Sequence, residues 1–166
     1  MRVYLPATAA VLAALREARV LGPAPLRAYA VTDDVRADVP GEDEEEAEFL
    51  ATLAAARESV LLLAADGSAP RRVVIAADVS TARPDDDPAR GAGAVLLGEE
   101  VPLARMASVH ADEEAAEQAV AAAAADPTEE RLDACEEHDL LWWATQELDE
   151  LLADLGGAHP DGAGPE

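Results

Sequence analysis

The run Val73-Val74-Ile75-Ala76-Ala77 constrains the fold more than any other part of the sequence. Its β-branched and small apolar residues follow one another without alternation, which is typical of a strand that is covered on both faces. Such a strand requires a sheet with helices packed against it. Residues 71–79 are therefore predicted to form a central strand.

Apolar blocks separated by turn signals predict further elements on both sides of this strand. The other predicted strands are 2–5, 26–31, 94–97, 105–110 and 140–144, with 94–97 and 105–110 paired around 98–102. The predicted helices are 9–19 with Thr8 as N-cap, 43–65, 112–125 with Asp112 as N-cap, 128–137, and one that follows Thr145. Residues 140–155 could instead be a single helix. In helix 43–65, an apolar stripe formed by Phe49, Leu53, Ala56, Val60 and Leu63 is expected to face the core.

This order of elements favours one α/β or α+β domain over residues 1–155. We expect a mixed sheet of four to six strands with packed helices, and a ferredoxin-like arrangement is one of the alternatives. Residues 156–166 are rich in glycine and proline and are expected to be a disordered tail.

The chain is strongly acidic. Twelve basic residues, all of them arginine, face 35 acidic ones, which gives a formal net charge of −23. Such a field repels nucleic acid and anionic membranes, so direct binding to either is not expected. A biased genome composition or adaptation to salt explains this acidity, which is compatible with a basic partner or with no specific partner. The partner we expect is an unknown protein or a second copy of this chain.

The location expected from the sequence is the cytoplasm. Cys135 is the only cysteine, so no disulfide can form within the chain. The first residues lack the apolar stretch of a signal peptide, and no apolar run is long enough to span a membrane. These features predict a soluble protein of a reducing compartment.

Common catalytic motifs are missing from the sequence. It has no phosphate-binding loop with its lysine, no Gly-x-Ser-x-Gly elbow, no dinucleotide-binding glycine pattern and no Cys-x-x-Cys pair. No cofactor is therefore expected, although unusual forms of an enzyme are not excluded.

One cluster of polar residues could still carry chemistry. Asp78, His110 and Asp112 follow or end predicted strands, where ligands bind if neighbouring strands are parallel. They could hold a divalent metal, or His110 could be a general base oriented by a carboxylate. The simpler interpretation is that Asp112 caps a helix and Asp78 lies where a strand becomes a loop.

Two further patterns are weak candidates for binding a metal or a basic partner. Cys135 and His138 would share one face of a helix and could contribute two metal ligands, which is fewer than a zinc site needs. The acidic runs 41–48 and 85–87 lack the ligand spacing of a calcium loop. A solvated helix start and a loop tip are the simpler interpretation of these runs.

Trp142 and Trp143 are adjacent and would point to opposite faces of a strand. Both could be buried in the core. If one is exposed, it becomes a candidate interface residue, because tryptophan is enriched where proteins bind each other.

Four motifs carry a resemblance to a known family: Arg-Val-Tyr-Leu-Pro-Ala-Thr at residues 2–8, Arg-Arg-Val-Val-Ile-Ala-Ala-Asp-Val at 71–79, Ala-Ser-Val-His-Ala-Asp at 107–112, and His-Asp-Leu-Leu-Trp-Trp-Ala-Thr-Gln-Glu at 138–147. The chain resembles an uncharacterised actinobacterial family, a domain of unknown function, over about residues 1–155. This resemblance implies no activity, cofactor or catalytic residue.

Three functions remain open at this point. The first is a non-catalytic binding or regulatory domain that acts through protein–protein contacts. The second is a small metal-dependent hydrolase that uses His110, Asp112 and Asp78. The third is an acidic mimic of nucleic acid, in which carboxylates imitate phosphates.

Overall fold

The computed structural model describes residues 1–156, and the expected tail lies almost entirely outside them. A seven-stranded sheet has the strand order β5-β6-β3-β1-β4-β8-β9, and every pairing in it is antiparallel. Its strands are β1 (Arg2–Ala7), β3 (Leu26–Tyr29), β4 (Val73–Asp78), β5 (Arg83–Pro84), β6 (Ala94–Leu97), β8 (Met106–Asp112) and β9 (Leu140–Trp143). Two further strands, β2 (Val20–Leu21) and β7 (Val101–Pro102), form a separate small sheet.

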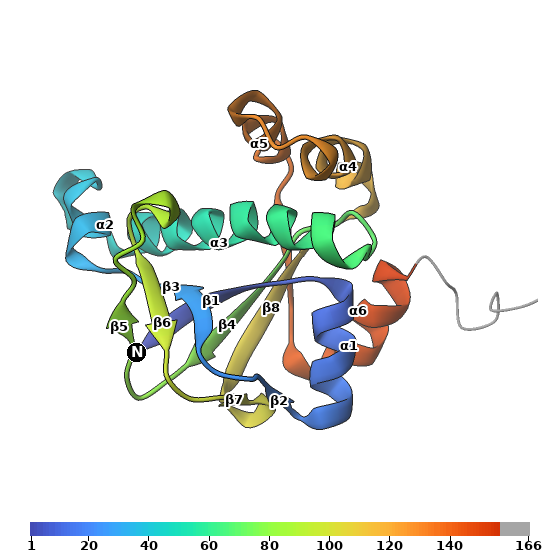
Figure 1. Cartoon of the computed structure of the whole chain (residues 1–166), viewed down its shortest axis with the longest axis horizontal. Coiled ribbons are helices and arrows are strands. Elements are labelled where there is room, and N and C mark those ends of the chain that lie inside the picture. Colours follow the sequence, from blue (N-terminus) through green and yellow to red (C-terminus); the bar gives the residue numbers. More distant parts are fainter. Residues whose placement is uncertain (157–166) are drawn as a thin grey trace, which may run out of the picture.

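Helices cover both faces of the large sheet (Figure 1). They are α1 (Ala9–Ala18), α2 (Asp33–Ala37), α3 (Glu44–Asp66), α4 (Glu117–Ala125), α5 (Glu129–Cys135) and α6 (Leu148–Leu155). The long helix α3 crosses one face, with α4 and α5 packed on its outer side, whereas α1 and α6 lie against the other face. The result is a three-layer α+β arrangement.

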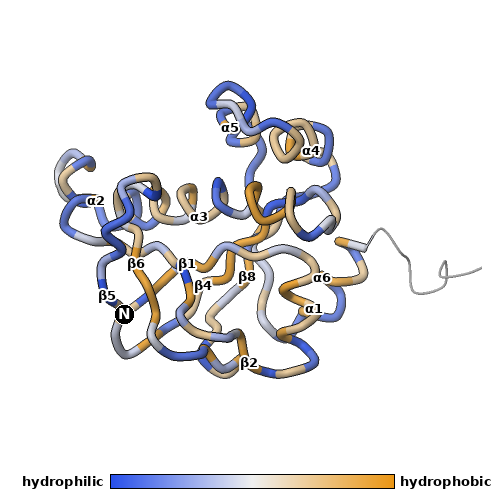
Figure 2. Tube along the Cα trace, in the orientation of Figure 1, coloured by the Kyte–Doolittle hydropathy of each residue, from blue (hydrophilic) through white to orange (hydrophobic). Residues whose placement is uncertain are grey.

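The central strand expected from the apolar run is β4. It lies between β1 and β8, and Val73, Val74 and Ile75 are inaccessible to solvent. Val73 and Ile75 face the layer of α1 and α6, whereas Val74 faces α3. Figure 2 shows hydrophobic residues concentrated along the central strands and hydrophilic ones on the outlying α5.

The neighbouring strand β1 has one incomplete side. It pairs with β4 along its whole length but with β3 only at Tyr4↔Tyr29. Beyond Tyr4, β3 therefore diverges from β1 and leaves a gap. Pro6 lies within β1, which extends past the expected end at residue 5. Pro6 has no N–H to leave unsatisfied beside this gap, which explains why a central strand tolerates it.

Helix α3 approaches the sheet through alanines. Asp43 caps its start by accepting from the N–H groups of Glu45 and Glu46, and Gly67 ends it in the left-handed region. Ala51 and Ala55 pack on the sheet, so the helix axis can lie close to the strands. The expected stripe is wrong at Phe49, whose side chain is exposed, because the smaller residues take the buried positions.

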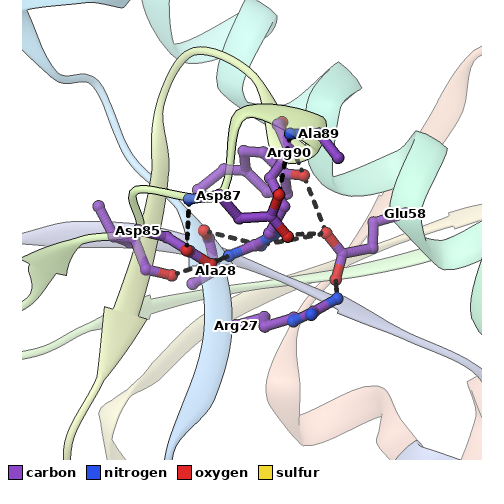
Figure 3. Close-up of polar contacts among 9 residues, drawn as sticks. Arg27, Ala28, Glu58, Asp85, Asp87, Ala89 and Arg90 are labelled. Atoms are coloured by element: carbon purple, nitrogen blue, oxygen red, sulfur yellow. Dashed lines mark hydrogen bonds and ion pairs between the residues drawn. The ribbon is translucent and has the colours of Figure 1, made fainter.

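Two buried polar groups attach α3 to the strands. Ser59 Oγ donates to the carbonyl of Ala7 (2.7 Å) and accepts from the N–H of Val73 (3.0 Å). Glu58 accepts from the hydroxyl of Tyr29 and from the guanidinium of Arg90, which also pairs with Asp85 (Figure 3). Asp85, which belongs to the acidic run 85–87, therefore has a structural partner, Arg90.

Several expectations from the sequence are wrong. The sheet has seven strands rather than four to six, because the two-residue strand β5, where the sequence predicts a loop, pairs with β6 and extends the sheet on one side. Strands β6 and β8 do not pair with each other, since β6 lies between β3 and β5. Asp112 is the last residue of β8 and not a helix cap. The sheet is antiparallel throughout, so strand ends alternate between its two sides and the polar residues there are separated.

Candidate functional site

Strand β9 forms one outer edge of the sheet. It pairs with β8 through His110↔Trp142 and Ala111↔Leu141, and no other strand of residues 1–156 pairs with it. The run Leu-Leu-Trp-Trp is therefore a strand, as predicted, and not part of one long helix. An edge strand directs alternate N–H and C=O groups away from its sheet, where another chain can bind them.

Two large apolar side chains of β9 are exposed to solvent. Trp142 is 63% exposed and Leu141 is 43% exposed. Trp142 lies on the α3 side of the sheet and Leu141 on the opposite side. Both are therefore accessible to a chain that approaches along the edge.

Trp143 has a different environment. It is half-buried against the core formed by β1, β4, α1 and α6. Of the two predicted interface residues, Trp143 thus anchors β9 in the fold, and Trp142 is the side chain presented to solvent.

Acidic residues flank β9 in the sequence. Arg131 is the last basic residue of the sequence. Acidic side chains both precede and follow β9, and those with exposed positions include Glu137, Asp139, Asp149 and Glu150. Strand β9 is therefore apolar along its length, and the segments before and after it carry exposed carboxylates, of which Asp149 pairs with Arg16 at 3.2 Å.

The opposite edge of the sheet is protected. Strand β5 there consists of only Arg83 and Pro84. A short edge strand with a charge and a proline is a common means of preventing further pairing. The comparison makes the longer, apolar and proline-free β9 the edge that is available for binding.

His110 lies beside Trp142 on β8. Its Nε2 atom is 3.1 Å from Ser108 Oγ, within hydrogen-bond distance. Burial lowers the pKa of His110, and the positive charge of Arg2 lowers it further. Sequence reasoning singled out His110 and overlooked Ser108, although residues two apart on a strand share a face.

Asp112 is occupied by a structural partner. Both of its carboxylate oxygens bind the guanidinium of Arg72, and Oδ2 also accepts from the Arg72 N–H. The Arg72 guanidinium donates in addition to the carbonyl of His138. These bonds satisfy the carboxylate and fix the segment that leads into β9.

Asp78 lies away from His110. It pairs with Arg2 at 2.9 Å, and this hydrogen bond lowers the pKa of its carboxyl group. His110 is opposite Val74, at the other end of β4, which puts Asp78 about 13 Å away along the strand. The structure therefore does not assemble Asp78 and His110 into one site.

Cys135 and His138 also lack the expected relation. Helix α5 ends at Cys135, so His138 lies in the following turn and not on the same helix face. Cys135 is buried, and burial raises the pKa of its thiol. Its Sγ donates to the carbonyl of Ala119 at 3.6 Å. Within residues 1–156, no group of three or more His, Cys, Asp or Glu side chains could hold a metal ion.

Comparison with known proteins identifies the family. A model described as a family of unknown function, DUF6912, matches residues 1–152, which is nearly all of the chain. The chain belongs to this family. No curated protein and no solved structure matches it significantly. In the DUF6912 domain, none of the helices described here is long and apolar enough to cross a membrane.

Proposed function

We propose that this DUF6912 domain is a non-catalytic protein-interaction domain that binds an extended, basic segment of a partner protein along the edge of β9. The observation that carries the proposal is the exposure of Trp142 on an edge strand to whose outer side no other strand of residues 1–156 pairs. An extended peptide can add to such an edge through main-chain hydrogen bonds, with its side chains giving specificity.

Charge supports a basic segment as the occupant. Acidic side chains at both ends of β9 and the net charge of −23 attract lysine and arginine. An arginine of the partner could also stack on Trp142, because a guanidinium is attracted to the face of an aromatic ring. Anionic partners such as nucleic acid are disfavoured by the same charge.

A peptide titration tests the proposal. The probe is a synthetic peptide of alternating arginine and valine, and binding is followed through the fluorescence of Trp142 and Trp143, the only tryptophans in the chain. We expect saturable binding with a blue shift of the emission as Trp142 is covered. Trp142→Ala should weaken binding by roughly 30-fold, the loss of about 2 kcal/mol that is typical of an interface hot spot; for this variant, binding is followed by titration calorimetry.

Matched controls separate strand addition from simple charge attraction. Leu61→Ala removes another exposed apolar side chain, on α3, and should leave binding unchanged. The same arginine–valine peptide with every main-chain nitrogen methylated keeps the charge but has no N–H to donate to β9, so it should bind much more weakly. Equal binding of both peptides, or undiminished binding by Trp142→Ala, would contradict the proposal.

A further inference from the structure

A pocket of about 390 Å³ lies where the sheet divides between β1 and β3. Apolar side chains from β1, β3, α1 and α3 line most of it, including Leu5, Leu15, Leu26 and Leu62. Its volume falls within the range of small-molecule sites. In the strand order of the sheet, β4 and β8 lie between β1 and β9. The pocket is therefore separate from the proposed protein-binding edge.

One charged group in this lining is deeply buried. The side chain of Glu58 is only 8% exposed, and it lines the same pocket. Its Oε1 atom accepts from Tyr29 Oη at 2.8 Å and from Arg90 Nε at 3.1 Å. Arg90 approaches Glu58 from one side and Arg27 from the other (Figure 3).

The second carboxylate oxygen is incompletely satisfied. Glu58 Oε2 accepts no hydrogen bond from the described residues, and its nearest cation, Arg27 Nη1, is 3.7 Å away. That distance is too long for a hydrogen bond. In the described part of the chain, every fully buried side-chain oxygen has a hydrogen-bond partner. Because Oε2 has none, it is not fully buried and part of its surface is accessible. A carboxylate oxygen with free lone pairs that borders a mostly apolar pocket is a strong acceptor for an N–H donor.

We infer that this pocket binds a small apolar primary amine, whose ammonium group donates to Glu58 Oε2 while its hydrocarbon part contacts the leucines. Arg27 does not prevent this, because its side chain is 59% exposed and can turn toward solvent. A carboxylate ligand could pair only with Arg27, which also lines the pocket, and would meet the negative charge of Glu58 beside it. The pocket therefore discriminates by charge as well as by size.

Amide chemical-shift mapping with three probes of equal chain length tests the inference: n-hexylamine, hexanoate and hexanol. We expect n-hexylamine to shift the amides of Leu5, Leu15 and Leu26 saturably, at least tenfold more tightly than the other two. Equal binding of the three probes, tighter binding of hexanoate, or shifts confined to the acidic surface elsewhere would overturn the inference.

Three variants make the test independent of folding defects. Ala14→Trp places a large side chain in the pocket from an exposed position of α1, and should weaken n-hexylamine binding at least tenfold. Ala10→Trp is the matched control, because Ala10 is exposed on the same helix outside the pocket. Arg27→Gln removes the competing cation and should tighten binding several-fold. Unchanged binding by Ala14→Trp, or loss of binding by Arg27→Gln, would contradict the assignment.

Discussion

Arg72 and Asp112 form a bidentate ion pair in the interior of the protein. Arg72 Nε lies 2.8 Å from Asp112 Oδ2, and Arg72 Nη2 lies 2.7 Å from Oδ1. The two side chains are 2% and 0% exposed. The pair connects the start of β4 with the end of β8, and through the His138 carbonyl it also holds the segment before β9.

Asp112→Ala is expected to destabilise the fold by about 3–5 kcal/mol, because it leaves the buried guanidinium of Arg72 without its counter-charge. Urea unfolding followed by circular dichroism measures this loss. Asp78→Asn is the control, since it breaks the exposed pair with Arg2 and should cost no more than about 1 kcal/mol. A similar loss of unfolding free energy in the two variants would show that the buried pair stabilises the fold no more than the exposed pair does.

Ser59→Ala is expected to cost about 1–3 kcal/mol, because the buried carbonyl of Ala7 and N–H of Val73 would both lose their partner. Thr52→Ala removes a hydroxyl that bonds only within α3, to the carbonyl of Glu48, and is the matched control. Thermal unfolding of the two variants gives the comparison. A Ser59→Ala protein as stable as the control would mean that the two strand groups find other partners.

The hydroxyl of Tyr29 is expected to ionise late. Burial is the main cause and the nearby charge of Glu58 adds to it, and together they raise the pKa of Tyr29 to about 12. Because the unfolded chain loses this proton near pH 10, stability should fall as pH rises from about 10 to about 12. Ultraviolet titration of the Tyr4→Phe variant isolates Tyr29. A midpoint near pH 10 in the folded protein would refute the expectation.

His110 is expected to stay neutral below the ordinary pKa of histidine. Burial lowers its pKa, so the unfolded chain takes up the proton first as pH falls, and stability contributed by the neutral ring is lost on acidification below about pH 6.5. Nuclear magnetic resonance of the imidazole protons measures the titration, and His110→Gln assigns the signal. An ordinary midpoint for that signal would contradict the burial of His110.

Much of the fold could be predicted from local patterns. The apolar run of β4, the Thr8 cap and the strand Leu140–Trp143 all follow from side-chain chemistry within a few residues. Strand pairing could not be predicted in the same way. Nothing local shows that β6 lies between β3 and β5, because the residues that decide this are distant in sequence.

The candidate site shows the same division. The alternation of a strand predicted that Trp142 and Trp143 face opposite sides, and the structure decides which of them is exposed. The grouping of Asp78, His110 and Asp112 depended on parallel neighbours, and an antiparallel sheet separates the first two. The sequence did not show that Asp112 pairs with Arg72. A buried carboxylate needs a cation, and the fold provides one from the residue just before β4.

The acidic residues that flank β9 bear on whether the protein aggregates in concentrated solution. Exposed apolar edges normally promote aggregation unless lysines, prolines or bulges protect them. Two identical edges would each bring carboxylates to the other, so we expect like-charge repulsion to oppose their pairing. That repulsion acts over only about 8 Å at physiological ionic strength and shortens further as salt is added. Colloidal stability of the protein should therefore be lowest in concentrated salt, where the edge loses its electrostatic protection.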